Sequence, residues 1–543
     1  MNQDLNRRNF LGMTGAGLLG GIAGAAPFTP PVVTVGEQTS PSGSGARPHN
    51  NERRNLVIFL PDETRADSLA CYGNPVTRTP NFDRLAKDGT RFANCHVQFP
   101  VCGASRCSLL TGWPTSVRGH RSLFYYLRPE EPNLFRYLRR AGYDVFWYGK
   151  NDALAAQCFY DSVTEWSETL YQGTHKSDPP LQLTPGALTM LYSPMGDRRQ
   201  TNDYACVQKA IEILERKEHE RPFCIFLPLI GAHPPYTAPK DFYNMYSPSE
   251  VPAPIPPGLK NKPSFQAGMR EMYGLEMLNE ATLRKIRAIY YGQVSYTDWL
   301  LGEVMEALDR TNSTKNTALF LLSDHGDYAG DFGLVEKWPS GLEDCLTHVP
   351  LIARVPGGAP GVVAEDMVEL YDVMQTVLDL AGTTATHTHF SRSLLPQMAG
   401  LAGDPNRAAF AEGGYNVYEP QCFEPLGSGG GEYVGKISLQ NEQPITVSRS
   451  AMIRTRTHKL IMRPQDRSEL YSYRDDPQER NNLYGTSGAT AVQAELQEAL
   501  LTHFLETSGI APYDKDSREC PPFYPTRKDM TPDGWQEKIL DKK

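Results

Sequence analysis

Four apolar segments, each followed by polar side chains that can do chemistry, constrain the fold of this chain most strongly. They cover residues 55–60, 143–148, 223–230 and 318–322. Short runs of this kind are typical of strands buried on both faces of a parallel sheet. Helical patterns lie between them at residues 133–141, 204–217 and 283–309. Alternating strands and helices predict an α/β fold, with a large, mostly parallel sheet sandwiched by helices.

Acidic residues follow the first and the last of these segments. Asp62 and Glu63 come after the first, and Asp324 and His325 come after the last. The carboxyl ends of parallel strands share one edge of a sheet, and ligands bind there. Three carboxylates gathered at that edge would repel one another unless a cation neutralised them, and an oxygen-rich set favours calcium. Taken singly, each acidic residue fits a solvated turn equally well.

The segment FPVCGASRCSLLTGWPTSVRGHR, residues 99–121, carries a candidate nucleophile. Residues 108–110 predict the first turn of a short helix that ends at Gly112, which places Cys102 at or just before a helix N-terminus. That position favours an anion, either a thiolate or a bound oxyanion. Arg106, four residues later, can point its guanidinium cation at the same place. A buried cysteine beside a surface arginine is the alternative for Cys-x-x-x-Arg alone.

The longer pattern Cys-x-Ala-Ser-Arg-x-x-x-Leu-Thr-Gly, from Cys102 to Gly112, resembles the signature of the type I sulfatases in the alkaline phosphatase superfamily. SDHGDYAGDFGLVEKW and THVPLIARVPG are most similar to the iduronate-sulfatase and choline-sulfatase branch, and the resemblance covers about residues 55–484. It implies a sulfuric ester hydrolase that cleaves a sulfate monoester, with a sulfated carbohydrate as the expected substrate. It also implies a formylglycine made from Cys102, whose hydrate is the nucleophile, and one calcium ion per chain.

The resemblance also implies the site residues. The metal ligands are Asp62, Glu63, Cys102, Asp324 and His325. The catalytic residues are Cys102, Arg106, Lys150, His233, Lys337 and His120. In this scheme Lys150 and Lys337 hold the sulfate oxygens, and His233 protonates the leaving oxygen.

Three positions depart from the family pattern. Glu63 stands where Asp is usual, and Ala104 stands where many members have Pro. Asn151 and Asp152 replace a Trp-His pair, so that either His120 or Asp152 takes the place of the missing histidine.

The ends of the chain suggest export and a smaller second domain. Residues 1–26 contain Arg7-Arg8 and a short Gly/Ala-rich run, which predicts a twin-arginine signal peptide rather than a membrane anchor. Residues 27–52 predict a flexible linker, 53–390 the catalytic domain and 391–543 a C-terminal α+β subdomain. The expected location is periplasmic or secreted. The expected partners are the twin-arginine export machinery and a formylglycine-generating enzyme.

Composition excludes some classes of function. A formal net charge of −9 argues against a nucleic-acid partner, and no later stretch is long enough for a membrane span. Two other functions stay open: a phosphonate or phosphodiester hydrolase with the same apparatus, and an inactive relative that binds sulfated glycans. Loops around Tyr415, Tyr418 and Cys422 are equally consistent with a substrate pocket and with a solvated insertion.

Overall fold

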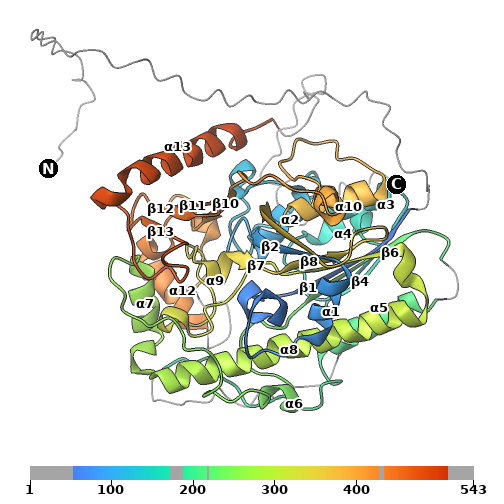
Figure 1. The fold of residues 1–543 in the computed structure, drawn as a ribbon, viewed down its shortest axis with the longest axis horizontal. Coiled ribbons are helices and arrows are strands. Elements are labelled where there is room, and N and C mark those ends of the chain that lie inside the picture. Colours follow the sequence, from blue (N-terminus) through green and yellow to red (C-terminus); the bar gives the residue numbers. More distant parts are fainter. Residues whose placement is uncertain (1–52, 172–186, 217–218, 427–432, 512–543) are drawn as a thin grey trace, which may run out of the picture. The chain divides into compact units, whose positions relative to one another are not determined.

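A large mixed sheet forms the centre of the chain from Arg53 onward (Figure 1). The computed structural model describes residues 53–171, 187–216, 219–426 and 433–511. The predicted signal peptide (1–26) and linker (27–52) lie outside the described residues.

The central sheet has nine strands in the order β4-β3-β5-β1-β6-β8-β2-β7, with β9 paired to β2. The strands are β1 (Asn55–Pro61), β2 (Thr90–His96), β3 (Asp144–Tyr148), β4 (Glu165–Ser167), β5 (Phe223–Leu229), β6 (Thr317–Leu322), β7 (His348–Val349), β8 (Leu351–Arg354) and β9 (Val362–Glu369). The pairs β4-β3, β3-β5, β5-β1 and β1-β6 are all parallel, so the carboxyl ends of these strands lie at one edge. Only β7 and β8 run antiparallel to their neighbours in this sheet, among the described residues.

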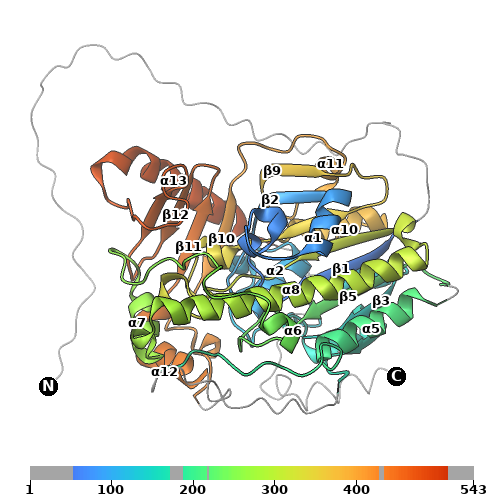
Figure 2. The same cartoon turned by 60° about the horizontal axis from the view of Figure 1, so that its bottom comes forward.

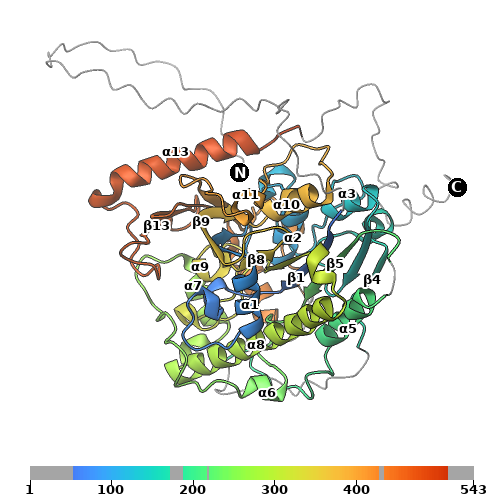
Figure 3. The ribbon, with the colours of Figure 1, turned by 45° about the vertical axis from the view of Figure 1, so that its right-hand side comes forward.

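Helices cover both faces of the sheet. The helices of this part of the chain are α1 (Pro80–Asp88), α2 (Cys102–Thr111), α3 (Leu134–Arg140), α4 (Phe159–Ser162), α5 (Asn202–Leu214), α6 (Lys240–Tyr243), α7 (Ser264–Met272), α8 (Glu280–Arg310), α9 (Asp344–Thr347), α10 (Asp372–Ala381) and α11 (Leu395–Met398). Helix α8 contacts α1, α5 and α6 on one face, and α2, α3 and α10 contact one another on the other (Figures 2 and 3).

Strand β1 shows why its sequence is apolar throughout. Val57 and Phe59 pack into the core on the α5 and α8 side, whereas Leu56, Ile58 and Leu60 pack into the core beneath α2 and α10. Successive side chains of a strand point to opposite faces, and here both faces are covered by helices. A charged residue at any of these positions would be buried without a partner.

A smaller antiparallel sheet follows in the C-terminal part. Its strands β10 (Ala409–Gly413), β11 (Ser450–Arg454), β12 (His458–Met462) and β13 (Glu469–Ser472) pair in that order. Helix α12 (Val434–Glu442) lies between β10 and β11 in the chain, and α13 (Thr490–Thr507) packs on β11 and β12. Strand β10 begins inside the predicted subdomain 391–543.

The predicted α/β fold with a smaller C-terminal α+β part is confirmed. The predicted helix at 283–309 lies within α8. Helix α2 starts at Cys102 itself, six residues before the predicted turn at Ser108. Among the residues that the structure describes, none of the helices has both the length and the hydropathy of a membrane span.

Candidate active site

The carboxyl ends of four neighbouring parallel strands bring most of the predicted site residues together. Lys150 follows β3, His233 follows β5, Asp62 and Glu63 follow β1, and Asp324 and His325 follow β6. These strands are consecutive in the sheet, and Cys102 approaches them as the first residue of α2. Gly149 allows the turn before Lys150: its φ is +128°, and a Cβ there would lie 2.2 Å from the Pro228 carbonyl oxygen.

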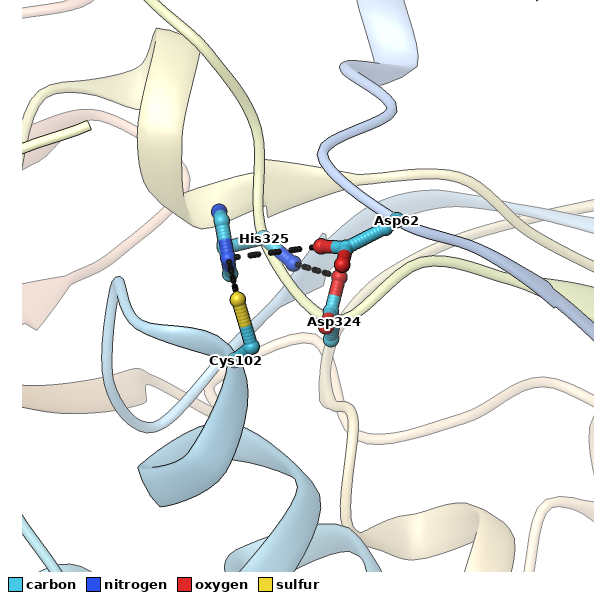
Figure 4. Close-up of side chains that lie close together, drawn as sticks. All are labelled: Asp62, Cys102, Asp324 and His325. Carbon is cyan, nitrogen blue, oxygen red and sulfur yellow. Dashed lines mark hydrogen bonds and ion pairs between the residues drawn. The ribbon is translucent and has the colours of Figure 1, made fainter. Parts of the chain in front are cut away.

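Asp62, Cys102, Asp324 and His325 form the centre of the site (Figure 4). One ligand atom from each lies within 4.8 Å of the others, and all four side chains are buried. The Cys102 Sγ is 3.1 Å from the His325 Nε2, which is 3.7 Å from an Asp62 oxygen. The Nδ1 of the same histidine is 2.9 Å from the Gly326 carbonyl oxygen. A proton on Nδ1 therefore satisfies that carbonyl and leaves the Nε2 lone pair facing the group.

Two cations balance the carboxylates of this centre. The Arg106 Nε donates to Asp324 at 2.7 Å, and a terminal nitrogen of the same guanidinium lies 3.3 Å from Asp62. The Lys150 Nζ is 2.7 Å from Asp62 and 3.6 Å from the Cys102 Sγ. Helix α2 thus places the cysteine and the arginine on the same side, where the planar guanidinium spans both aspartates.

The carboxylates of the centre differ in their electrostatics. Burial acts to raise the pKa of Asp62, but Lys150 and Arg106 hold it well below its usual value. Burial raises the pKa of Asp324 to about 7 despite the Arg106 contact. Burial and the Asp62 charge raise the pKa of Cys102 well above that of a free thiol. The unmodified residue is therefore a neutral thiol, and its place at a helix N-terminus does not make it a thiolate.

The central group has the donor chemistry of a divalent cation site. It offers two carboxylates and an imidazole nitrogen, and Asp62 Oδ1 has no hydrogen-bond partner among the described residues although it is buried. Buried polar atoms are normally satisfied, and paired carboxylates of this kind are relieved by a cation. The side chains present therefore fit a bound metal ion.

Glu63, predicted as a metal ligand, faces a neighbouring group. Its carboxylate contacts the Lys337 ammonium, and its Oε1 is 3.1 Å from the His233 Nε2. Glu63, Cys102 and His233 form a second set of possible ligands within 4.8 Å. Lys337 already neutralises the Glu63 carboxylate, so the role of Glu63 as a metal ligand stays a prediction.

His233 and Lys337 lie side by side. The His233 Nδ1 faces the Pro234 carbonyl, and its Nε2 is 3.1 Å from the Lys337 Nζ. Burial, together with Lys337 and Lys150, lowers the pKa of His233 well below its usual value. In the free protein the neutral imidazole therefore accepts a hydrogen bond from the lysine at Nε2.

A cavity of about 330 Å³ opens over these groups. Cys102, Lys150, His233 and Lys337 line it together with residues from the segment around 123–126 and from the C-terminal part. Lys436 of α12 reaches it and lies 2.9 Å from the Glu336 carboxylate. Lys436 is not predicted from the sequence, because a single lysine far along the chain carries no signal of its place in a pocket.

The loop residues singled out from the sequence do not line this cavity. Tyr415 and Cys422 are buried, and Tyr418 is exposed. Glu424 and Tyr433 line the cavity instead. The C-terminal part does contribute to the pocket, but through neighbouring residues.

The structure corrects the prediction that His120 enters the site. Its Nδ1 is 2.7 Å from the Tyr125 carbonyl oxygen and its Nε2 is 3.2 Å from Glu131, and it is not among the residues that line the cavity. Asp152 lies there instead, with its carboxylate 2.9 Å from the Lys150 Nζ and 3.2 Å from the Tyr126 hydroxyl. The chain turns so soon after β3 that Asp152, two residues beyond Lys150, faces the same lysine.

Substitution of Asp152 and of His120 tests which of the two residues contributes to the site. We expect Asp152→Ala to lower kcat/KM for a sulfate ester about tenfold or more, because Lys150 loses one of the two carboxylates that fix its ammonium. His120→Ala should leave kcat/KM near the parent value and lower only the melting temperature. Steady-state kinetics and thermal unfolding of both variants check this; a larger loss of kcat/KM in His120→Ala would contradict the placement.

Comparisons with known proteins identify relatives of this chain. A family model described as "Sulfatase" matches residues 54–383, which is more than half of the chain. The chain is 29% identical over 390 residues to the iduronate 2-sulfatase of Homo sapiens, covering 64% of this chain and 69% of that protein. It is 25% identical over 363 residues to an arylsulfatase of Clostridium perfringens (strain 13 / Type A), covering 60% and 74%.

Solved structures show the same fold. The phosphonate monoester hydrolase of Agrobacterium radiobacter superposes with a TM-score of 0.69 at 21% identity, over 84% of this chain and 96% of that one. A protein solved in complex with its substrate D-glucosamine-2-N,6-O-disulfate superposes with a TM-score of 0.65 at 20% identity, over 86% and 100%. Because the family model matches more than half of the chain, including β1, β3, β5, β6 and the loops that follow them, the chain belongs to the sulfatase family, a family of sulfuric ester hydrolases.

Proposed function

We propose that this chain hydrolyses a sulfate monoester with a formylglycine at position 102 and a calcium ion in the group Asp62, Cys102, Asp324 and His325. The observation that carries the proposal is the arrangement around Cys102. The acidic group lies on one side of its Sγ, and Lys150 and Lys337 line the cavity with it. A negatively charged sulfate ester in the cavity would meet these ammonium groups while its sulfur faces residue 102.

Residue 102 and the metal-binding group would each contribute a separate part of the chemistry. A formylglycine hydrate at position 102 would supply the nucleophilic oxygen, and its second hydroxyl would allow sulfate to be released. Calcium held by Asp62, Asp324 and His325 would supply positive charge at that oxygen. Arg106, fixed by two aspartates, orients these ligands from the same helix that begins at residue 102.

The chain's own residues handle the charge of the reaction. Lys150 and Lys337 bind the sulfuryl oxygens and stabilise the negative charge that develops on them. His233 faces the cavity beside Lys337 and gives a proton to the leaving alcohol oxygen. The neutral imidazole of the free protein takes up that proton from solvent when the anionic ester binds, since a nearby negative charge raises its pKa.

We further propose that the substrate is a carbohydrate sulfate and that the protein is exported. The Arg7-Arg8 sequence and the apolar run that follows favour export of the folded protein by the twin-arginine machinery to the periplasm or beyond. A formylglycine-generating enzyme would modify Cys102 before folding buries it. The small residues Gly103 and Ala104 leave the unfolded segment accessible to such an enzyme.

The activity is tested with 4-nitrophenyl sulfate and a 4-nitrophenyl phosphonate monoester. The parent protein should hydrolyse the sulfate, with Cys102→Ala lowering kcat by at least about a thousandfold because the nucleophile is lost. Cys107→Ala is the matched control: Cys107 is buried in the same helix but does not line the cavity, so its removal should leave kcat near the parent value. Preference for the phosphonate would favour the phosphonate hydrolase alternative, and no turnover of either ester would favour a binding protein.

The metal is tested by thermal unfolding of protein stripped with a chelator. Calcium should raise the free energy of unfolding by about 2.7 kcal/mol at a free concentration one hundred times its Kd, and magnesium at that same concentration should raise it by less. Asp324→Asn should abolish this increase. Asp331→Asn is the control, because this buried aspartate of the same loop pairs with Arg65 and Arg287 instead. An increase that survives in Asp324→Asn would contradict the assigned site.

A further inference from the structure

Asp203, a buried residue in the first turn of α5, holds the start of the loop that carries His233. Its two carboxylate oxygens accept hydrogen bonds from the backbone N–H groups of Ile230 at 2.9 Å and Gly231 at 2.8 Å. The loop packs closely here: a Cβ on Gly231 would lie 2.9 Å from a methyl carbon of Thr297 on α8. Asp203 therefore fixes the point at which the chain leaves β5.

Gln293, a buried residue of α8, holds the other side of the same loop. Its Nε2 donates to the His233 carbonyl oxygen at 3.1 Å and to the Pro235 carbonyl oxygen at 3.3 Å. Helices α5 and α8 lie on the same face of the sheet and contact each other (Figure 2). Two helices thus hold the backbone on both sides of His233.

Neither residue lines the reaction cavity. Asp203 and Gln293 line a separate cavity of about 170 Å³, and His233 lines both cavities. A substrate held beside Cys102 and Lys337 would touch the imidazole but not the residues behind it. Any effect of Asp203 or Gln293 on the reaction must therefore pass through the loop.

We infer that Asp203 and Gln293 are positioning residues, which clamp the loop at residues 230–235 so that the His233 imidazole stays beside Lys337 and faces the leaving group. The inference rests on the proposed function, because it assigns to His233 a contact with the substrate. Backbone clamps of this kind fix a side chain to within a fraction of an ångström, and a misplacement of about 1 Å can cost about a hundredfold in rate.

Burying the Asp203 carboxylate costs free energy, and capping of α5 does not account for its burial. Among the described residues it forms no ion pair, and its partners are the two loop N–H groups. The cap of α5 is supplied by Thr201, whose side chain accepts from the Tyr204 N–H. The helix dipole stabilises an acidic residue in the first turn, but a solvent-facing carboxylate would gain the same stabilisation without the free-energy cost of burial.

A double-mutant cycle on kcat with 4-nitrophenyl sulfate tests the inference. Asp203→Asn and Gln293→Ala should each lower kcat about tenfold to a hundredfold, with KM changing much less. In a His233→Ala background the same substitutions should cost almost nothing further, because the side chain that they position is gone. The two substitutions are independent, so either supports the cycle if the other prevents folding.

Asp298→Asn is the matched control for a merely structural effect. Asp298 is also buried and lies on α8, but it accepts the backbone N–H of Phe82 in α1 at 2.7 Å and not an N–H of the loop. Its loss should lower the melting temperature without changing kcat. Equal losses of kcat in the presence and absence of His233, or an equal loss in Asp298→Asn, would overturn the inference. If the parent protein does not hydrolyse 4-nitrophenyl sulfate, the proposed function fails, which is a distinct result.

Discussion

The structure depends on buried charge held in balance at the carboxyl edge of the sheet. Arg106 spans Asp62 and Asp324, and Lys150 adds a second cation to Asp62. Burying these groups singly would cost several kcal/mol each, so they remain charged only as a set. The set joins the ends of β1, β3 and β6 to the start of α2, which makes the electrostatics of the site part of the fold. Removing one member would leave another charge uncompensated.

The charged groups beside residue 102 form two sets. On the metal side, two carboxylates and an imidazole converge beside residue 102. On the cavity side, Lys150, Lys337 and Lys436 face the space over Cys102, where carboxylates restrain each of them. An anionic group in the cavity therefore finds three ammonium groups beside residue 102. The arrangement suits a reaction in which negative charge moves from a nucleophile at position 102 towards a leaving oxygen.

The sequence allowed much of the fold and the centre of the site to be predicted, for identifiable reasons. A strand buried on both faces must be apolar, so β1 and β6 and the acidic residues after them are visible in the sequence. Contacts made across long separations are not visible: Lys436 enters the cavity from α12, and Asp203 clamps a loop from α5. His120 was expected to replace the family histidine that is missing after Lys150, but its ring turns to Tyr125 and Glu131.

The central claim is that residue 102 is a formylglycine in the active protein, and the mass of one peptide tests it most directly. Trypsin releases residues 92–106, which contain both Cys95 and Cys102, so one peptide carries its own control. After alkylation of the denatured active protein, the account predicts an alkyl group on Cys95 alone and an aldehyde, with a lower mass, at position 102. A peptide alkylated at both positions in protein that hydrolyses sulfate esters at full rate would contradict the account.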